Sequence, residues 1–284
     1  MADTLFLSTR TLQRFKRIQV LLDQLQPEAE SRAYVVPGTP EPRDGMIVFP
    51  GSFNPPTTAH IALLKQAREF ARAHGPMTLY AAFSKRTVDK EAVERPLLLD
   101  RIVLLDDILR KRLPHAGILL FNRGLYVEEA EAIQRSFPRV RRILFLLGFD
   151  KIVQILDPHY YKDRDASLAE LFKRAELLVA PRGDAGEEEL YKLLHQPQNE
   201  RFARFIRPLP FGENYRNVSS TAARVGVNGA ASEVPQEVRR FMRETHAYSP
   251  PMKKSDGSLV DYYGLRVQYL QHVLHDRRDI PSRH

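Results

Sequence analysis

The sequence predicts an α/β fold in which a parallel sheet is covered by helices on both faces. Short apolar runs, typical of strands that are buried on both sides, alternate with segments of helical periodicity along the 284-residue chain. Such alternation implies parallel strands joined by right-handed crossovers. The apolar content of 43% is enough for one large core and excludes a disordered or fibrous protein.

The N-terminal part precedes this pattern. Apolar residues recur at helical spacing from Leu12 to Leu25 and predict an amphipathic helix over about 9–26. Residues 27–45 are rich in proline and glycine, and we expect them to form an irregular linker across the surface. We therefore assign residues 1–44 to an N-terminal helical extension.

The central part, residues 45–248, carries the alternating pattern and is predicted to be one domain. The predicted strands cover residues 46–49, 77–83, 117–121, 142–147 and 176–180. The predicted helices cover about 58–74, 97–113, 126–136, 167–175 and 187–196. Beyond these, a strand is predicted near 202–209, a short helix at the second motif described below, and helices over 235–245 and about 259–275. Residues 249–284 form a predicted C-terminal helical extension.

The first motif, GSFNPPTTAH over residues 51–60, directly follows the first strand of this domain. Gly51 would let an anion approach the backbone, and Ser52 and Phe53 would offer N–H groups to it. The following threonines can cap a helix whose first turn contains His60, so the positive helix end faces the same place. An ordinary β-turn and a surface histidine are the alternatives. The ten-residue pattern favours a phosphate site.

The second motif, VSSTAAR over residues 218–224, lies far downstream. Its hydroxyls, from Ser219, Ser220 and Thr221, stand at a predicted helix start, and Arg224 follows one turn later, suited to bidentate contact with phosphate. Alone, the motif could be a helix cap followed by a solvated arginine. Together, the two motifs predict a single pocket that holds one polyphosphate by charge neutralisation, with no covalent intermediate.

Further candidate residues follow other strands at the carboxyl edge of the sheet, where such folds bind ligands. Lys85 follows the second strand and could neutralise a triphosphate, although a basic surface loop is an equal alternative. Arg182 and Arg216 have the same two interpretations. Asp150 could accept hydrogen bonds from a ribose or a ring amide, or could form an Asx turn at a helix start.

Composition narrows the function classes. The chain has no cysteine, which excludes thiolate zinc sites and cysteine nucleophiles, and its histidines show no metal-ligand spacing. Motifs of dinucleotide oxidoreductases, P-loop enzymes, zincins and α/β hydrolases are absent from the sequence. The formal net charge of +8 favours anionic partners, for which nucleotides suffice. Basic residues form isolated pairs, so no nucleic-acid partner is expected. No apolar run is long enough for a membrane span and no signal peptide is recognised, so we expect a cytoplasmic protein without a membrane partner.

The two motifs resemble those of the nucleotidylyltransferase superfamily, most closely the eukaryotic-type nicotinamide/nicotinate mononucleotide adenylyltransferases, over residues 45–248. The segment LGFD at 147–150 resembles the Gly-x-Asp of that family, and VAPRG at 179–183 resembles its strand followed by an arginine loop. The resemblance implies a Rossmann-like sheet with strand order 3-2-1-4-5. It also implies ATP as co-substrate together with Mg²⁺, which would be held through phosphates and water rather than by protein ligands.

The resemblance also implies roles for particular residues. His60 would bind phosphate in the transition state, and Lys85 would be a basic loop residue that touches the triphosphate. Gly51 to Phe53 would form the backbone cradle, and Ser220, Thr221 and Arg224 would hold the β- and γ-phosphates, with Arg224 counted as catalytic beside His60 and Lys85. Gly148 and Asp150 would hold the mononucleotide. The further predicted substrate-binding residues are Asn54, Thr57, Arg182, Arg216 and Ser219. Thr57 stands where the bacterial form has its first histidine.

One feature departs from the family pattern. The family stacks the pyridine ring on tryptophan, and this chain has none. The segment 122–126, after the third strand, also differs. Phe149, Tyr160 or Tyr161 are the candidates for a replacement platform.

These observations predict an adenylyltransferase that joins the AMP part of ATP to nicotinamide or nicotinic acid mononucleotide. The alternatives are the same chemistry on another acceptor, such as phosphocholine or phosphopantetheine with CTP as donor, and a nucleotide-binding regulatory protein without turnover. The sequence does not determine the oligomeric state and is compatible with a homo-oligomer.

Overall fold

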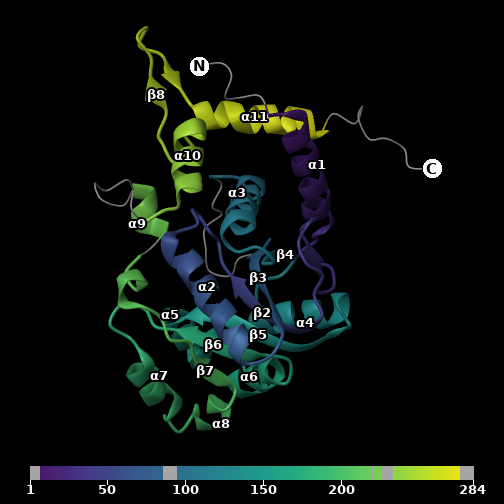
Figure 1. The fold of residues 1–284 in the computed structure, drawn as a ribbon, viewed down its shortest axis with the longest axis vertical. Coiled ribbons are helices and arrows are strands. Elements are labelled where there is room, and N and C mark those ends of the chain that lie inside the picture. Colours follow the sequence, from purple (N-terminus) through teal and green to yellow (C-terminus); the bar gives the residue numbers. More distant parts are fainter. Residues whose placement is uncertain (1–6, 86–94, 219, 226–232, 276–284) are drawn as a thin grey trace, which may run out of the picture.

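The apolar runs form strands of a central seven-stranded sheet (Figure 1). The computed structural model describes residues 7–85, 95–218, 220–225 and 233–275. The strands are β1 (Ala33–Val35), β2 (Asp44–Pro50), β3 (Met77–Ser84), β4 (Gly117–Phe121), β5 (Val140–Gly148), β6 (Glu176–Ala180) and β7 (Ile206–Pro208). They lie in the order β1-β4-β3-β2-β5-β6-β7, and every neighbouring pair is parallel except β1 with β4.

This order differs from the predicted 3-2-1-4-5 because the sheet has two further edge strands. β1 adds an antiparallel edge beside β4, and β7, which the sequence placed near 202–209, extends the opposite edge. Between these edges the five parallel strands lie as β4-β3-β2-β5-β6. The chain therefore places β3 and then β4 on one side of β2. It then crosses to the other side of β2, where β5 and β6 follow in order. The gap between β2 and β5 is the switch point of the topology.

Helices cover both faces of this sheet, as predicted. The helices of the first half are α1 (Thr9–Gln24), α2 (Thr58–Ala73), α3 (Leu98–Arg112), α4 (Tyr126–Ser136) and α5 (Phe149–Leu156). Those of the second half are α6 (Arg164–Phe172), α7 (Glu187–Leu194), α8 (Glu200–Ala203), α9 (Ser220–Val225), α10 (Gln236–Thr245) and α11 (Tyr262–His275). Two short 3-10 turns, η1 (Pro158–Tyr160) and η2 (Glu213–Tyr215), and a hairpin of β8 (Met252–Lys253) and β9 (Leu259–Val260) complete the described elements.

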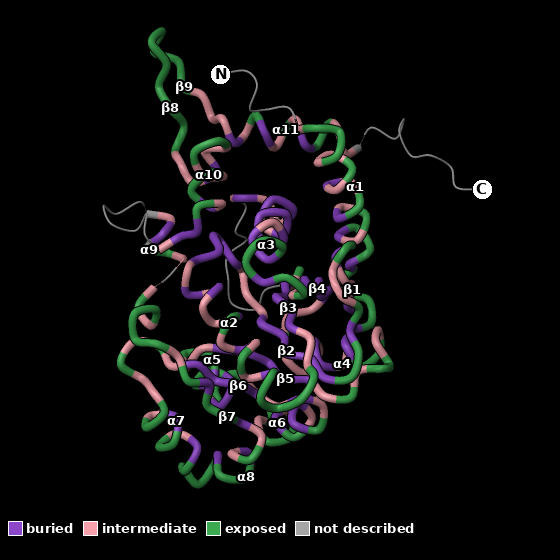
Figure 2. Tube along the Cα trace, viewed as in Figure 1, coloured by how far each residue is buried: buried purple, intermediate pink, exposed green. Residues whose placement is uncertain are grey.

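Side chains of each strand alternate between two hydrophobic clusters. In β2, Ile47 belongs to a cluster that includes residues of α1, α2, α3, α10 and α11, whereas Val48 belongs to a cluster with residues of α4 to α8. Both are fully buried. This alternation follows from the period of two along a strand, and apolar residues at both phases produce the continuous runs seen in the sequence. Figure 2 shows the buried strands and α3 at the centre, with the β8–β9 hairpin exposed.

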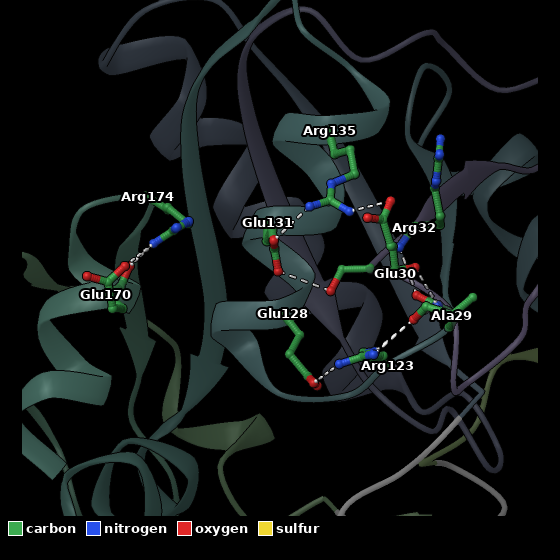
Figure 3. A network of polar contacts seen from close by, with 11 residues as sticks. Ala29, Glu30, Arg32, Arg123, Glu128, Glu131, Arg135, Glu170 and Arg174 are labelled. Carbon is green, nitrogen blue, oxygen red and sulfur yellow. Dashed lines mark hydrogen bonds and ion pairs between the residues drawn. The ribbon is translucent and has the colours of Figure 1, made fainter. Parts of the chain in front are cut away.

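The proposed linker over 27–45 is wrong as a description of this segment, because it contains β1 and the start of β2. Asn122, directly after β4, receives a hydrogen bond from the N–H of Arg32 (2.8 Å) and donates to the carbonyls of Gln26 and Glu30 (2.8 and 2.9 Å). Figure 3 shows Arg135 between the carboxylates of Glu30 and Glu131 on the same side of the molecule. These hydrogen bonds and ion pairs hold the part of the segment in which prolines prevent regular secondary structure.

The C-terminal extension also packs on the central part. Tyr263 and Leu270 of α11 are fully buried, and Leu270 shares a cluster with Phe15 of α1 and Leu105 of α3. In Figure 1, α11 lies across the ends of α1 and α10. The segments on either side of residues 45–248 therefore contribute to one core with it. Within the described residues, none of the helices has the length and apolar character required to cross a bilayer.

Candidate active site

A cleft of about 310 Å³ lies at the carboxyl ends of β2, β5 and β6. Phe49 and Pro50 of β2, Leu147 and Gly148 at the end of β5, and Ala180 of β6 form its floor. The cleft therefore spans the switch point between β2 and β5, where open parallel sheets bind ligands. Residues of α2, α4, α5 and the segment 211–218 complete its walls.

The loop between β2 and α2 runs from Pro50 to Thr57, two residues that line the cleft, and hydrogen bonds from distant elements hold the loop. The carbonyl of Ser52 accepts from Arg101 of α3 (2.9 Å). The side chain of Asn54 is fully buried, donates to the carbonyl of Arg95 (3.2 Å) and accepts from the hydroxyl of Tyr248 (2.7 Å). Polar groups of this loop are thus paired with the protein.

Gly51 has a packing role that differs from the predicted one. Its N–H donates to the carbonyl of Ala82 (3.0 Å), so this N–H is already paired within the protein. A Cβ atom at Gly51 would lie 3.0 Å from the ring of Phe53, which is fully buried and has a φ of 42°. Within the part of the chain that the structure describes, the N–H groups of Ser52 and Phe53 have no acceptor. Neither residue is among those that line the cleft, so their contact with an anion stays a prediction.

His60 lines the cleft in the first turn of α2, and its environment fixes its protonation pattern. Its Nδ1 accepts a hydrogen bond from the backbone N–H of Thr57 (2.9 Å), in a capping box where the Thr57 hydroxyl accepts from the N–H of His60 (3.4 Å). A backbone amide can only donate, so Nδ1 carries no proton and the neutral ring carries its proton on Nε2. The ring also contacts Phe49 and Phe53, with centroids 5.8 and 5.1 Å away.

The second motif meets the first, as the sequence predicted. The hydroxyl of Ser220 donates to the carbonyl of Pro55 (2.9 Å), and Arg224 donates to the carbonyl of Asn54 (3.1 Å) and to the hydroxyl of Thr221 (3.0 Å). Residues about 165 positions apart in the chain are therefore in direct contact. Val218, at the start of this motif, lines the cleft, whereas Ser220, Thr221 and Arg224 are not among its lining residues. Ser219 lies outside the described residues.

Positive charge predominates on the opposite wall. Arg182 follows β6 and forms an ion pair with Asp150 of α5 (2.6 Å), with both side chains about half exposed. Arg216 lines the same cleft, and its Nε is buried without a hydrogen-bond partner. Lys151 is a further lining residue. Among the described residues of this lining, Asp150 is the single carboxylate, so the cleft suits a polyanion.

Lys85 does not line this cleft, although it was predicted to act there. Its ammonium group donates to the carbonyl of Leu22 in the last turn of α1 (2.9 Å), where a cation also interacts favourably with the helix dipole. The sequence placed Lys85 correctly at the end of β3, but it gave no indication that α1 ends nearby. The structure therefore does not bring Lys85 together with His60.

The aromatic residues of the cleft differ from those expected. Tyr160 is 54% exposed outside it, Tyr161 donates to the carbonyl of Ile155, and Phe149 lines a neighbouring cavity of about 230 Å³. Tyr126 and Tyr215 line the cleft instead, along with Phe49 and Phe211. Tyr126 begins the helix after β4, a position at the same sheet edge that sequence reasoning did not use.

A buried carboxyl group lies at the same sheet edge. Glu129 of α4 is 2% exposed and accepts a hydrogen bond from the hydroxyl of Ser84 at the end of β3 (2.6 Å), while its Oε2 has no partner among the residues that the structure describes. Burial raises the pKa of this carboxyl to about 8. Sequence patterns did not indicate it, because a glutamate in a first helical turn is common at the surface.

No group of three or more metal-binding side chains occurs among the described residues. Comparison of the sequence with protein-family models and with curated proteins finds no match.

Proposed function

We propose that this protein is an adenylyltransferase that transfers the AMP part of Mg·ATP to nicotinamide or nicotinic acid mononucleotide. The supporting observation is the contact between the two motifs beside a cationic cleft at the switch point of the sheet. A lone glycine turn or a lone hydroxyl-rich helix start would be a weak signal. Their meeting in space, beside His60, is what a shared polyphosphate site requires.

In the proposed reaction, a 5′-phosphate oxygen of the mononucleotide attacks the α-phosphorus of ATP. The bond from that phosphorus to the oxygen bridging to the β-phosphate breaks, and pyrophosphate leaves with its electron pair. Catalysis rests on positioning and on neutralising the developing charge. Mg²⁺ enters with the ATP phosphates as part of the substrate.

The residues of the cleft suit these tasks. The Nε2–H of His60 would donate to a phosphate oxygen, and its tautomer is already set by Thr57. Arg216 and Arg182 would bind phosphate, with Arg182 exchanging its exposed contact with Asp150 for the ligand. Tyr126 and Tyr215 would provide aromatic surface for a base in place of the missing tryptophan.

The test is an assay of the full chain with Mg·ATP and each pyridine mononucleotide, scored for dinucleotide by chromatography and for pyrophosphate. We expect the two products in equal amounts. His60→Ala should lower turnover about 100- to 1,000-fold, the cost typical of losing one charge-stabilising donor. The matched control is His74→Ala, an exposed histidine at the other end of α2.

The alternatives give different results. Pyrophosphate release that requires a different phosphorylated acceptor or CTP would redirect the proposal to another transferase of this chemistry. Binding of ATP without pyrophosphate release, across all these acceptors, would show a nucleotide-binding regulatory protein. Near-normal turnover of His60→Ala would contradict the role of His60.

A further inference from the structure

A second groove, of about 460 Å³, lies between α1 and α3 and shares no lining residue with the cleft. Arg10, Arg14 and Arg17 line it from α1, and Arg110 lines it from α3. Spacings of four and three residues place the first three on one face of their helix. Four guanidinium groups thus point to one region of the surface.

Two of these arginines are held in place by a buried carboxylate. Asp106 of α3 is 1% exposed and pairs with both Arg14 and Arg110, the latter at 3.0 Å. Arg14 also pairs with Asp107 (2.6 Å) and donates to the carbonyl of Val103 (3.2 Å). A guanidinium fixed in this way loses little conformational entropy when an anion binds.

The loop after β1 closes the groove against Arg110. Gly38 has a φ of +86°, and a Cβ atom there would lie 2.8 Å from Nη2 of Arg110. Arg110 also donates to the carbonyl of Pro37 (3.3 Å). The guanidinium therefore lies directly on the backbone of this loop, which only glycine permits at this position.

Arg10 and Arg17 complete the set and are exposed. In the described ranges, neither has a hydrogen bond or ion pair within the protein. Four guanidinium groups face two carboxylates in this region, so positive charge is in excess. None of the described residues that line the groove is aromatic; its apolar contacts come from Ile18, Pro37 and Gly38.

We propose that this groove binds a small soluble compound with two or three linked phosphate groups, recognised through the phosphates and not through a base. Guanidinium groups bind phosphate oxygens in a bidentate manner, and several of them can share a chain of phosphates. The volume is within the range of small-molecule sites. The lack of an aromatic platform means that a nucleoside adds little affinity. This site is independent of the proposed function of the cleft.

The test is hydrogen exchange of the full chain during titration with pyrophosphate, ADP, inorganic phosphate and citrate. Peptides from α1 report the groove, and peptides from α2 and α5 report the cleft separately. Pyrophosphate and ADP should protect α1 at similar concentrations, and phosphate and citrate should do so only at much higher ones. The double variant Arg10→Gln/Arg17→Gln should weaken protection of α1 about 100-fold, from about tenfold for each charge-assisted contact.

The matched control is Arg139→Gln/Arg141→Gln, which removes the same charge from exposed positions at β5. It should leave protection of α1 unchanged. Unaltered exchange of α1 at saturating pyrophosphate would overturn the proposal. So would equal loss in the two double variants, which would show a general charge effect, or protection by ADP alone, which would show recognition of the base. Because the substituted arginines are exposed and have no ion pair among the described residues, both variants should fold.

Discussion

The junction of α3 with α11 and the cleft both contain an arginine–carboxylate pair, but at opposite degrees of burial. At the junction, the side chain of Asp100 is 1% exposed and that of Arg266 is 9% exposed. In the cleft, the side chains of Asp150 and Arg182 are 68% and 47% exposed. Desolvated partners cannot be separated without leaving a bare charge in the interior, whereas half-exposed partners exchange readily with water or a ligand. The degree of burial thus distinguishes charged side chains that stabilise the fold from charged side chains that can bind a ligand.

Further polar contacts surround the Asp100–Arg266 pair at the junction. Tyr263 donates to Asp100 (2.8 Å) and accepts from the N–H of Leu97 (2.7 Å), while Arg95 pairs with Asp261 (2.7 Å). The carbonyl of Arg95 in turn accepts from the buried Asn54 of the cleft loop. The C-terminal extension is thereby connected to the first motif through a continuous set of polar contacts.

The largest expected effect is on stability at the junction. Arg266→Ala should lower the free energy of unfolding by about 3 to 5 kcal/mol, because Asp100 would remain buried without its cation. Urea denaturation measures this. Arg182→Ala is the matched variant in the cleft and should change stability by less than about 1 kcal/mol. Similar losses of unfolding free energy in the two variants would show that burial does not distinguish structural charges from binding charges.

Glu129 is a buried carboxyl group that has no ion pair among the described residues. The pKa of Glu129 is raised from 4.5 to about 8. Between these pH values the unfolded chain releases a proton that the folded protein retains, so stability should fall as pH rises from about 5 to 8, by on the order of 3 kcal/mol. Glu129→Gln should remove this contribution and be more stable than the parent at pH 8, with little difference at pH 4.5. Parallel pH profiles of the two proteins would contradict this assignment.

Removing a cation from the cleft should affect binding and not folding. Arg216→Ala should raise the KM for ATP about 10- to 100-fold, the loss typical of a charge-assisted contact, with unfolding free energy nearly unchanged. Steady-state kinetics and urea denaturation of one preparation give both values. Arg141→Ala, an exposed arginine outside the cleft, is the control. A loss of stability without a change in KM would place Arg216 with the structural charges.

The smallest effect is expected at Lys85. Because its ammonium contacts the end of α1, Lys85→Ala should change turnover less than about twofold and cost about 0.5 kcal/mol of stability. A large loss of turnover at unchanged stability would restore the catalytic role that the sequence suggested.

Much of the sheet could be predicted because the signal is local. The strands β2 to β6 are apolar runs, and α2, α3, α4 and α6 between them have their apolar residues at helical spacing, so each of these could be placed within a few residues; the short helix α5 was not predicted. β1 could not be, because its pairing partner β4 is about 90 positions away, as is Asn122, which accepts a hydrogen bond from Arg32 just before the strand. A three-residue edge strand in a proline-rich segment carries no pattern of its own.

For the candidate site, the chain itself determined the motifs, the helix start at Thr57 with His60 in its first turn, and the positions of Asp150 and Arg182 just after strands. The resemblance predicted that the two motifs meet, but the packed fold alone showed the partner of each group, such as the end of α1 for Lys85, and the burial of Glu129. The physical reason is the sequence distance over which each effect acts. Propensity and periodicity act over a few residues, whereas desolvation and ion pairing depend on neighbours brought together only by the packed fold.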